Sequence, residues 1–234
     1  MMILNTLEIP SNPLLKVKKP RVWVTAGRSF IARNIIEQLD YDFTSTVYEQ
    51  LDLTDPEAVA TFLEHEYFDI VIHTACVGGR FGQEDNQSIF DINYDMFENL
   101  LANEHHFKYL INIGSGADRF DTWYGKSKRV IANIIKIKKN MVNLRCFGVW
   151  GKYEKLDRFP STCIMSDEIT IPEDKLMRYI HVDGLVKIID GLINKWPKNK
   201  REMTLGEPIL LSEFAKQLNP SIKVIIQGKG EDYV

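Results

Sequence analysis

Short apolar runs alternate with amphipathic stretches along most of this chain. Four runs are mostly apolar from end to end, which is typical of strands buried on both faces of a parallel sheet: residues 21–25, 69–75, 108–113 and 142–147. Three stretches repeat apolar side chains at helical spacing: residues 30–39, 89–103 and 125–138. Strands and helices that alternate in this order predict an α/β fold, with a Rossmann-type doubly wound parallel sheet.

Weaker patterns predict the remaining elements. Residues 45–48 are compatible with a second strand, and Thr54 or Asp55 can cap a helix that has Pro56 at its first position. Beyond Gly151 the pattern loosens, and residues 152–173 are expected to form a loop-rich segment over the sheet. The last expected elements are a helix at 184–195, a strand at 201–205, a helix at 211–218 capped by Ser212, and a strand at 223–226.

These elements divide the chain into three expected parts. Residues 1–19 form an N-terminal arm, because prolines discourage regular structure there and lysines keep the segment hydrated. Residues 20–150 form a dinucleotide-binding Rossmann domain. Residues 151–234 form a small, truncated C-terminal substrate lobe, interleaved with the last elements of the sheet.

Composition narrows the classes of function. The 234 residues have a net charge of −3, with 26% charged and 44% hydrophobic residues, so we expect neither nucleic acid nor a membrane surface as the main partner. No apolar run approaches the roughly 20 residues of a membrane span, and the first residues lack the features of a signal peptide. Three cysteines without a Cys-x-x-Cys motif predict reduced thiols, a cytoplasmic location and no metal site.

Ser115, Tyr124 and Lys128 are the candidate catalytic residues. Ser115 follows a predicted buried strand, which would deliver it to the edge of the sheet where ligands bind in such folds. Tyr124 and Lys128 are four positions apart on the next predicted helix, so they share one face. An ammonium group beside a phenol is expected to lower the tyrosine pKa and to make the phenol a usable proton donor and acceptor.

The segment Thr25-Ala-Gly-Arg-Ser-Phe-Ile-Ala32 lies between the first predicted strand and helix. Small residues in such a turn let the backbone approach a pyrophosphate at the helix N-terminus. Arg28 could pair with a phosphate, including the 2′-phosphate of NADP, whereas Glu49 near the second strand would favour NAD. The sequence therefore leaves the choice of cofactor open.

Eight segments, in the same order, resemble the extended short-chain dehydrogenases/reductases of the NAD-dependent epimerase/dehydratase family, and within it the GDP-fucose synthases (GDP-4-keto-6-deoxymannose epimerase/reductases). The segments are Arg21-Val-Trp-Val-Thr-Ala-Gly-Arg, Leu51-Asp-Leu-Thr-Asp, Asp69-Ile-Val-Ile-His-Thr-Ala-Cys-Val-Gly-Gly, Ile92-Asn-Tyr-Asp-Met-Phe-Glu-Asn, Ile113-Gly-Ser, Tyr124-Gly-Lys-Ser-Lys, Arg145-Cys-Phe-Gly-Val-Trp-Gly and Tyr179-Ile-His-Val-Asp.

The resemblance implies a hydride-transfer site. Tyr124 would exchange a proton with the substrate oxygen, Ser115 would donate a hydrogen bond to that oxygen, and Lys128 would bind the nicotinamide ribose and lower the Tyr124 pKa. The resemblance also implies that NADP or NAD is bound by Lys128 together with Thr25, Ala26, Gly27, Arg28, Ser29, Phe30, Ile31, Asp52, Leu53, Thr74, Ala75 and Cys76. Asn93 would give structural support.

Departures from the family pattern shape the expected activity. The family turn has three glycines where this chain has Ala26, Ser29 and Ala32, and only nine positions separate Ser115 from Tyr124, so the substrate-facing loop is short. GDP-fucose synthases epimerise with a cysteine and a histidine; here Ala117 replaces the cysteine, residues 152–173 contain no histidine, and Cys163 is the only thiol expected in reach. We therefore expect an NAD(P)-dependent reductase of a nucleotide-linked keto-sugar, of the 4-ketoreductase type, in deoxysugar or surface-polysaccharide biosynthesis.

Two alternatives remain at this point. One is an epimerase or dehydratase of the same family, although Asp118 and Asp121, the nearest acidic pair, are expected to be loop charges. The other is a non-catalytic nucleotide-binding scaffold that has lost turnover. The expected partners are a nucleotide-sugar substrate and a second copy of the chain, because isoleucines lie on more than one side of the helix at 125–138.

Overall fold

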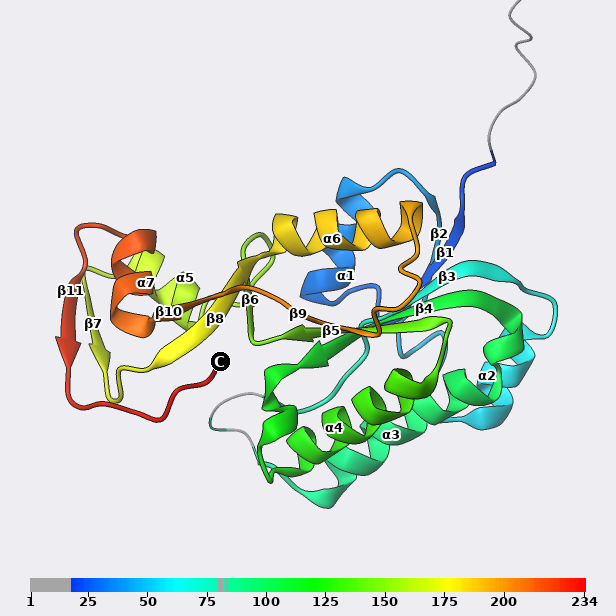
Figure 1. The fold of residues 1–234 in the computed structure, drawn as a ribbon, viewed down its shortest axis with the longest axis horizontal. Helices are drawn as coiled ribbons and strands as arrows, with labels where there is room; N and C mark the ends of the chain where they lie inside the picture. The colour runs from blue at the N-terminus through cyan, green and yellow to red at the C-terminus, as the bar shows by residue number, and fades with distance from the viewer. Residues whose placement is uncertain (1–17, 80–81, 83) are drawn as a thin grey trace, which may run out of the picture.

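A six-stranded parallel sheet forms the centre of the computed structural model, which describes residues 18–79, 82 and 84–234 (Figure 1). The strand order is β2-β1-β3-β4-β5-β9, and every neighbouring pair is parallel. The strands are β1 (Arg21–Val24), β2 (Asp42–Ser45), β3 (Phe68–His73), β4 (Phe107–Ser115), β5 (Met141–Cys146) and β9 (Glu202–Thr204). Residues 1–17 of the expected N-terminal arm lie outside the described residues.

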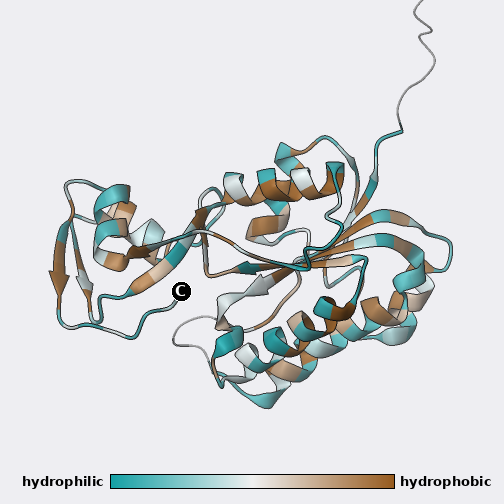
Figure 2. Cartoon of the chain, viewed as in Figure 1, coloured by the Kyte–Doolittle hydropathy of each residue, from teal (hydrophilic) through white to brown (hydrophobic). Residues whose placement is uncertain are grey.

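Helices cover both faces of this sheet (Figure 1). One face carries α1 (Phe30–Gln38) and α6 (Val182–Asn194), and the other carries α2 (Pro56–Leu63), α3 (Gln87–Ala102) and α4 (Trp123–Ile137). Along β1, Val22 and Val24 pack toward the first face and Trp23 toward the second, because strand side chains alternate. The helices turn their apolar sides to the sheet (Figure 2). The predicted doubly wound α/β fold is confirmed.

The remaining elements form a smaller lobe beside the central sheet (Figure 1). Its strands make a three-stranded sheet, β10-β8-β6, and a two-stranded sheet, β11-β7. The elements are β6 (Gly148–Trp150), α5 (Phe159–Met165), β7 (Glu168–Ile171), β8 (Leu176–His181), β10 (Glu207–Leu210), α7 (Leu211–Leu218) and β11 (Lys223–Ile226). The prediction of a loop-rich segment at 152–173 is therefore wrong, because α5 packs against α7 and β7 pairs with β11.

Three local predictions can be compared with the structure. Asp55 caps α2 as expected, because its carboxylate accepts hydrogen bonds from the backbone N–H groups of residues 57 and 58 at 2.9 and 3.1 Å. The second strand ends at Ser45 instead of beginning there. Ser212 does not cap α7: the cap residue is Leu210, and the Ser212 hydroxyl donates to Asp174 at 2.6 Å.

None of the helices in the described residues is both long enough and apolar enough to cross a membrane.

Candidate active site

Ser115 and the helix after it meet at the carboxyl end of β4. Ser115 is the last residue of that strand, and its hydroxyl accepts a hydrogen bond at 3.1 Å from the N–H of Ala117, at the start of the 3₁₀ helix η2 (Gly116–Arg119). The chain then enters α4, whose second and sixth residues are Tyr124 and Lys128. Because β1 and β3 also end at this edge of the parallel sheet, the candidate catalytic and nucleotide-binding segments lie together.

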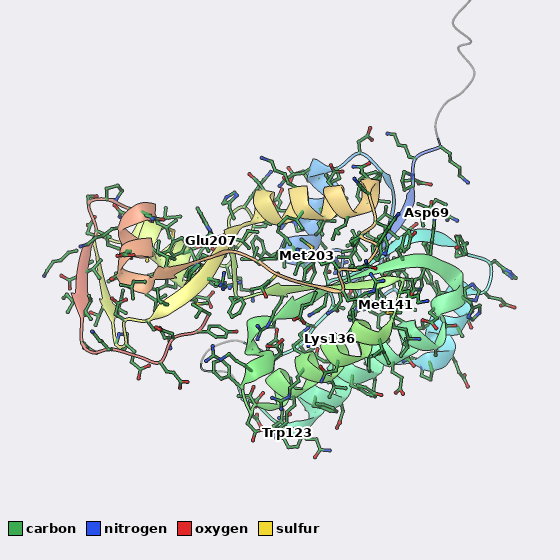
Figure 3. All side chains as sticks on the ribbon, viewed as in Figure 1. Asp69, Trp123, Lys136, Met141, Met203 and Glu207 are labelled. Atoms are coloured by element: carbon green, nitrogen blue, oxygen red, sulfur yellow. The ribbon has the colours of Figure 1, made fainter. Side chains whose placement is uncertain are left out.

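The N-terminus of α4 is fixed from two directions. Within the helix, Thr122 accepts a hydrogen bond from the N–H of Gly125 at 2.9 Å. From a distant segment, the Asp85 carboxylate accepts hydrogen bonds from the N–H groups of Trp123 and Tyr124, at 2.7 and 3.0 Å. Figure 3 shows Trp123 at this outer end of the helix. Asp85 therefore fixes the backbone that carries Tyr124; no sequence signal links the two residues, which are 39 positions apart.

Tyr124 lies against a glycine backbone. A side chain on Gly79, which has a φ of +78°, would place its Cβ 2.5 Å from the Tyr124 ring. Burial raises the Tyr124 pKa, and this effect exceeds the lowering influence of the Ser115 hydroxyl and of Arg158. The expectation that the pKa of this tyrosine would be lowered is therefore wrong for this structure. The phenol keeps its proton through the neutral range.

Lys128 is a buried cation whose nearest ionisable neighbours are neutral. Only 4% of the residue is exposed, and its ammonium nitrogen lies 5.5 Å from the centroid of the Tyr124 ring. Burial, together with the smaller effect of the Lys128 charge, lowers the pKa of the adjacent His73 to about 3. The ammonium group is thus available to donate hydrogen bonds to ligand hydroxyl groups.

The turn after β1 has the shape of a nucleotide-binding loop. Ala26 takes a φ of 51°, the left-handed region that favours glycine, so the family conformation is kept although the first glycine is missing. Gly27 has no room for a side chain, because its Cβ would lie 2.9 Å from the Cβ of Ser45. Ser29 caps α1 by accepting a hydrogen bond from the N–H of Ala32 at 3.3 Å. The loop therefore leads its backbone directly into a helix N-terminus.

Thr25 joins the ends of β1 and β3. Its hydroxyl oxygen accepts hydrogen bonds from the N–H groups of Thr74 and Ala75, at 3.0 and 3.1 Å, while the Thr74 hydroxyl donates to the Thr25 carbonyl. The next residues are held by Asn93, whose side-chain amide bonds both backbone groups of Val77 at 2.9 and 3.0 Å. The segment from Thr74 through Cys76 is consequently fixed beside the turn, with Cys76 exposed.

The other expected cofactor residues are less directly placed. Arg28 is exposed and paired with Glu49 at 3.1 Å. The Asp52 carboxylate accepts hydrogen bonds from the backbone and hydroxyl of Thr54, at 2.9 and 2.7 Å. Leu53 is buried in the core, and Phe30 and Ile31 are partly buried against it.

A cavity of about 400 Å³ lies beside the turn. Sequence reasoning missed the cation that lines it, Arg33, whose guanidinium carbon lies 3.5 Å from the centroid of the Tyr153 ring. The residue at the end of β2 is Ser45, which is not acidic, and it also lines this cavity. The full lining is Gly27, Arg33, Ile36, Glu37, Ser45 and Tyr153.

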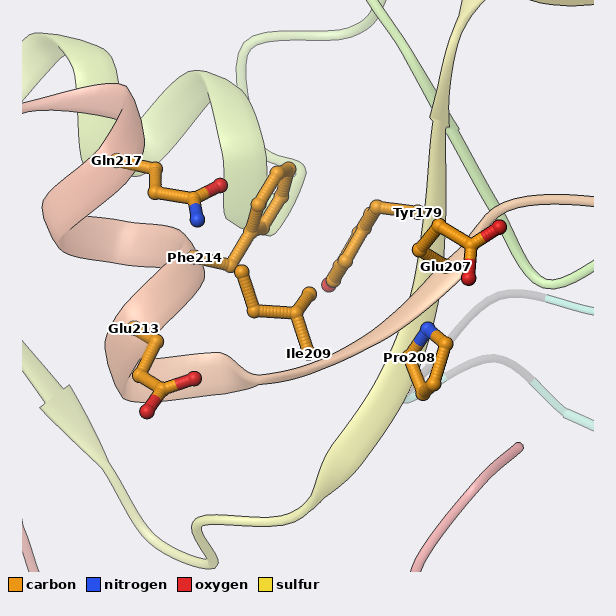
Figure 4. Close-up of a pocket in the computed structure, with 7 residues that line it drawn as sticks. All are labelled: Tyr179, Glu207, Pro208, Ile209, Glu213, Phe214 and Gln217. Atoms are coloured by element: carbon orange, nitrogen blue, oxygen red, sulfur yellow. The ribbon is translucent and has the colours of Figure 1, made fainter.

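A second cavity, of about 360 Å³, lies in the smaller lobe (Figure 4). Tyr179 and Phe214 stack there with ring centroids 3.9 Å apart, and Glu207 and Glu213 stand at its rim. Its carboxylates would repel the diphosphate of a nucleotide. We therefore place the chemistry at Ser115 and not in this lobe cavity.

The residues considered for epimerisation or dehydration are paired with other side chains or buried away from the site. Asp118 accepts two hydrogen bonds from Nε of Arg145, at 2.9 and 3.0 Å, so it is not a free loop charge. Asp121 pairs on the surface with Lys126 at 3.1 Å. Cys163 is fully buried in the core of the smaller lobe, and burial raises the pKa of its thiol to about 11. The expectation that Cys163 is the thiol in reach is wrong; Cys76 lies near Tyr124 instead.

Comparison with known proteins assigns the family. The model of the NAD dependent epimerase/dehydratase family matches residues 15–206. This chain belongs to that family. A GDP-L-colitose synthase of Yersinia pseudotuberculosis is 29% identical over 102 residues, and that match spans 41% of this chain and 33% of the length of the synthase.

Solved structures share the fold over most of the chain. The GDP-mannoheptose C4 reductase of Campylobacter jejuni, with NADP bound, matches at 13% identity with a TM-score of 0.75, covering 92% of this chain and 90% of its own. The dTDP-4-dehydrorhamnose reductase of Bacillus anthracis, in complex with NADP, matches at 20% identity with a TM-score of 0.76, covering 89% and 84%. At these identities the likeness supports a common fold.

Proposed function

We propose that this protein is an NADPH-dependent reductase of a nucleotide-linked keto-sugar, of the 4-ketoreductase type, in deoxysugar or surface-polysaccharide biosynthesis. The observation that carries the proposal is that Ser115, Tyr124 and Lys128 lie at the sheet edge that also carries the nucleotide-type turn. Family membership and the activities named for the two NADP-bound reductases support it.

Each of the three side chains has its own role in reduction of the carbonyl group. Reduced nicotinamide, when bound, supplies a hydride to the carbonyl carbon of the sugar. Ser115 donates a hydrogen bond to the carbonyl oxygen, and the Tyr124 phenol gives its proton to the same oxygen, so that the carbonyl becomes a hydroxyl. The raised pKa of Tyr124 keeps the phenol in the protonated form that reduction needs. Lys128 holds and orients the ribose hydroxyls.

The described residues fit a dinucleotide. Gly27 lets the turn pack closely against Ser45, and the N–H groups at the start of α1 can bind the negative charge of a pyrophosphate. A carboxylate at the end of the second strand would bind the ribose 2′-hydroxyl of NAD, but Ser45 stands there. Arg33 provides a positive charge in the adjoining cavity, whose carboxylate, Glu37, is paired with Lys152. We therefore favour NADPH over NADH, with residues 20–150 as the dinucleotide-binding domain and residues 151–234 as the substrate lobe.

The test is NADPH oxidation by the purified protein with GDP-, dTDP- and UDP-linked 4-keto-6-deoxyhexoses. Tyr124→Phe should keep NADPH binding, measured by tryptophan fluorescence, and lower kcat by about a thousandfold, because the variant lacks the phenol that gives the proton. Tyr67→Phe is the matched control, since the Tyr67 side chain is exposed and remote from Ser115.

Different results would refute the role of Tyr124 and the function itself. Turnover retained by Tyr124→Phe would remove the phenol from the chemistry. Absence of NADPH binding at millimolar cofactor would refute the reductase and favour the alternative of a non-catalytic scaffold. Products inverted at a carbon other than the reduced one would instead indicate the epimerase alternative, and Cys76→Ala would then test the exposed thiol near Tyr124.

The assembly and location are part of the same proposal. We infer a homodimer formed through the outer face of α3 and α4, where the partly exposed rings of Phe90 and Tyr94 stack at 5.9 Å and Trp123 adjoins Phe90 at 6.5 Å. Free thiols at Cys76, Cys146 and Cys163 support a reducing compartment, the cytoplasm.

A further inference from the structure

Residues 227–234 run from the smaller lobe to the candidate active site. They pair with the lobe through backbone hydrogen bonds, of which the last joins the N–H of Tyr233 to the carbonyl of Leu176 at 2.7 Å. The Asp232 carboxylate accepts a second bond from the Leu176 N–H at 2.9 Å. Figure 1 shows this segment ending between the lobe and the start of α4.

Arg119 ties the same segment to the residues after Ser115. Its guanidinium donates to the carbonyl of Val234 at 3.2 Å and lies 3.8 Å from the Glu231 carboxylate. Arg119 is the last residue of η2, the 3₁₀ helix that Ser115 caps. The segment is thus held at both sides of Tyr233, by the lobe and by η2.

The Tyr233 ring packs between two aromatic rings that flank Ser115. Its centroid is 5.1 Å from that of Phe120, which ends η2, and 5.0 Å from that of Phe147. Phe147 follows Cys146, the register partner of Ser115, and its ring fills the space where a Cβ on Gly116 would lie. These contacts place Tyr233 directly over the end of β4.

The ionisation of Tyr233 supports this position. Burial raises its pKa to about 12, the Ser115 hydroxyl lowers it, and the neighbouring Tyr124 raises it again. The Tyr233 phenol therefore stays protonated beside the two groups that we assign to the reacting oxygen. A protonated phenol can both donate and accept a hydrogen bond.

We infer that Tyr233 is a substrate-contacting residue that sets specificity: its phenol binds a hydroxyl of the keto-sugar on the carbon next to the reacting carbonyl. The inference rests on the proposed function. Only nine positions separate Ser115 from Tyr124, so the connection between them forms a short wall, and residues 227–234 complete it by packing on Phe120. A sugar whose carbonyl oxygen is bound by Ser115 would therefore have its neighbouring hydroxyl beside the Tyr233 phenol.

Substitution of the phenol tests the contact. Tyr233→Phe keeps the ring packing and removes the hydroxyl, so kcat/KM for the keto-sugar should fall about tenfold, mainly through KM, with the Kd for NADPH unchanged. Tyr67→Phe should change neither value. An unchanged KM in Tyr233→Phe would overturn the inference. A rise in kcat/KM in Tyr233→Ala would also overturn it, because the segment would then be an obstruction.

A spectroscopic measurement separates this inference from the proposed function. The protein carrying 3-fluorotyrosine only at position 233, loaded with NADP, is titrated with the GDP-, dTDP- and UDP-linked sugars, and its ¹⁹F resonance should shift with at least one of them. The same label at position 67 should not shift. A shift without NADPH oxidation would support the contact and refute the reductase, whereas oxidation without a shift would do the reverse.

Discussion

The side chains of His73, the last residue of β3, and Lys128 are neighbours, and only Lys128 is charged. The Thr25 hydroxyl oxygen already accepts two backbone hydrogen bonds, so it donates its proton to Nδ1 of His73, 3.2 Å away. His73 therefore carries its proton on the other ring nitrogen and is neutral. Burial disfavours the charged form of His73, and the Lys128 charge adds to this effect, so the pKa of His73 is lowered to about 3.

This histidine should make stability depend on pH. The unfolded chain protonates it near pH 6.5 and the folded chain only near pH 3, so its stabilising contribution is complete above pH 6.5 and is lost as the pH falls. We expect His73→Asn, which keeps an acceptor for Thr25, to reduce the loss of unfolding free energy below pH 6.5 by about 1.4 kcal/mol per pH unit. Urea denaturation at about pH 5 to 8 measures this slope. His65→Gln, at an exposed site, should keep the wild-type slope.

Ser45 should decide between the two cofactors. In Ser45→Asp the new carboxylate would repel a 2′-phosphate and accept a hydrogen bond from a 2′-hydroxyl, so the Kd for NADPH should rise about tenfold or more while that for NADH falls. Fluorescence titration measures both constants, and Ser45→Ala is the control in which neither should change by more than about threefold. Equal effects on NADPH and NADH would show that Ser45 does not lie at the 2′ position.

At the scale of elements, α4 depends on a carboxylate outside the helix. Asp85→Ala removes the acceptor for two N–H groups of the first turn, which should lower the free energy of unfolding by about 1 kcal/mol. Because the second of these groups belongs to Tyr124, kcat should fall more than NADPH affinity. Urea denaturation and steady-state kinetics measure the two effects. Asp91→Ala, an exposed position on α3, should leave both unchanged.

The boundaries of helices and strands show which features can be predicted from the local residue pattern. Asp55 and Pro56 start α2 as expected, because a cap and its helix are neighbours in sequence. The second strand was misplaced because β2 has a weak apolar pattern. The helix α5 was not predicted, because it is stabilised by packing against α7. Where distant contacts supply the stability, sequence periodicity carries little signal.

At the scale of the whole molecule, the outer face of α3 and α4 is the predicted dimer contact. Light scattering after size exclusion should give twice the 27.1 kDa chain mass. Tyr94→Glu should shift the protein toward a monomer, because it places a charge within the stacked pair with Phe90. Lys136→Glu, near the C-terminal end of α4 and away from Trp123 (Figure 3), is a charge-change control. A wild-type monomer at all concentrations would contradict the dimer.

The fold class was predictable from the residue pattern alone, and the same pattern selected three residues of the candidate site. Apolar strands and amphipathic helices leave periodic patterns, and the four-residue spacing of Tyr124 and Lys128 is a property of one helix. Ser115 was predictable for the same reason, as the residue that ends a buried strand.

The contacts around these residues could not be predicted without the three-dimensional structure. Asp85 at the start of α4, Arg33 beside the turn and Tyr233 over Ser115 come from segments far apart in sequence, and no local spacing connects them. The pKa of Tyr124 also depends on the tertiary structure, because the sequence shows the lysine one turn away but not the burial that raises the pKa.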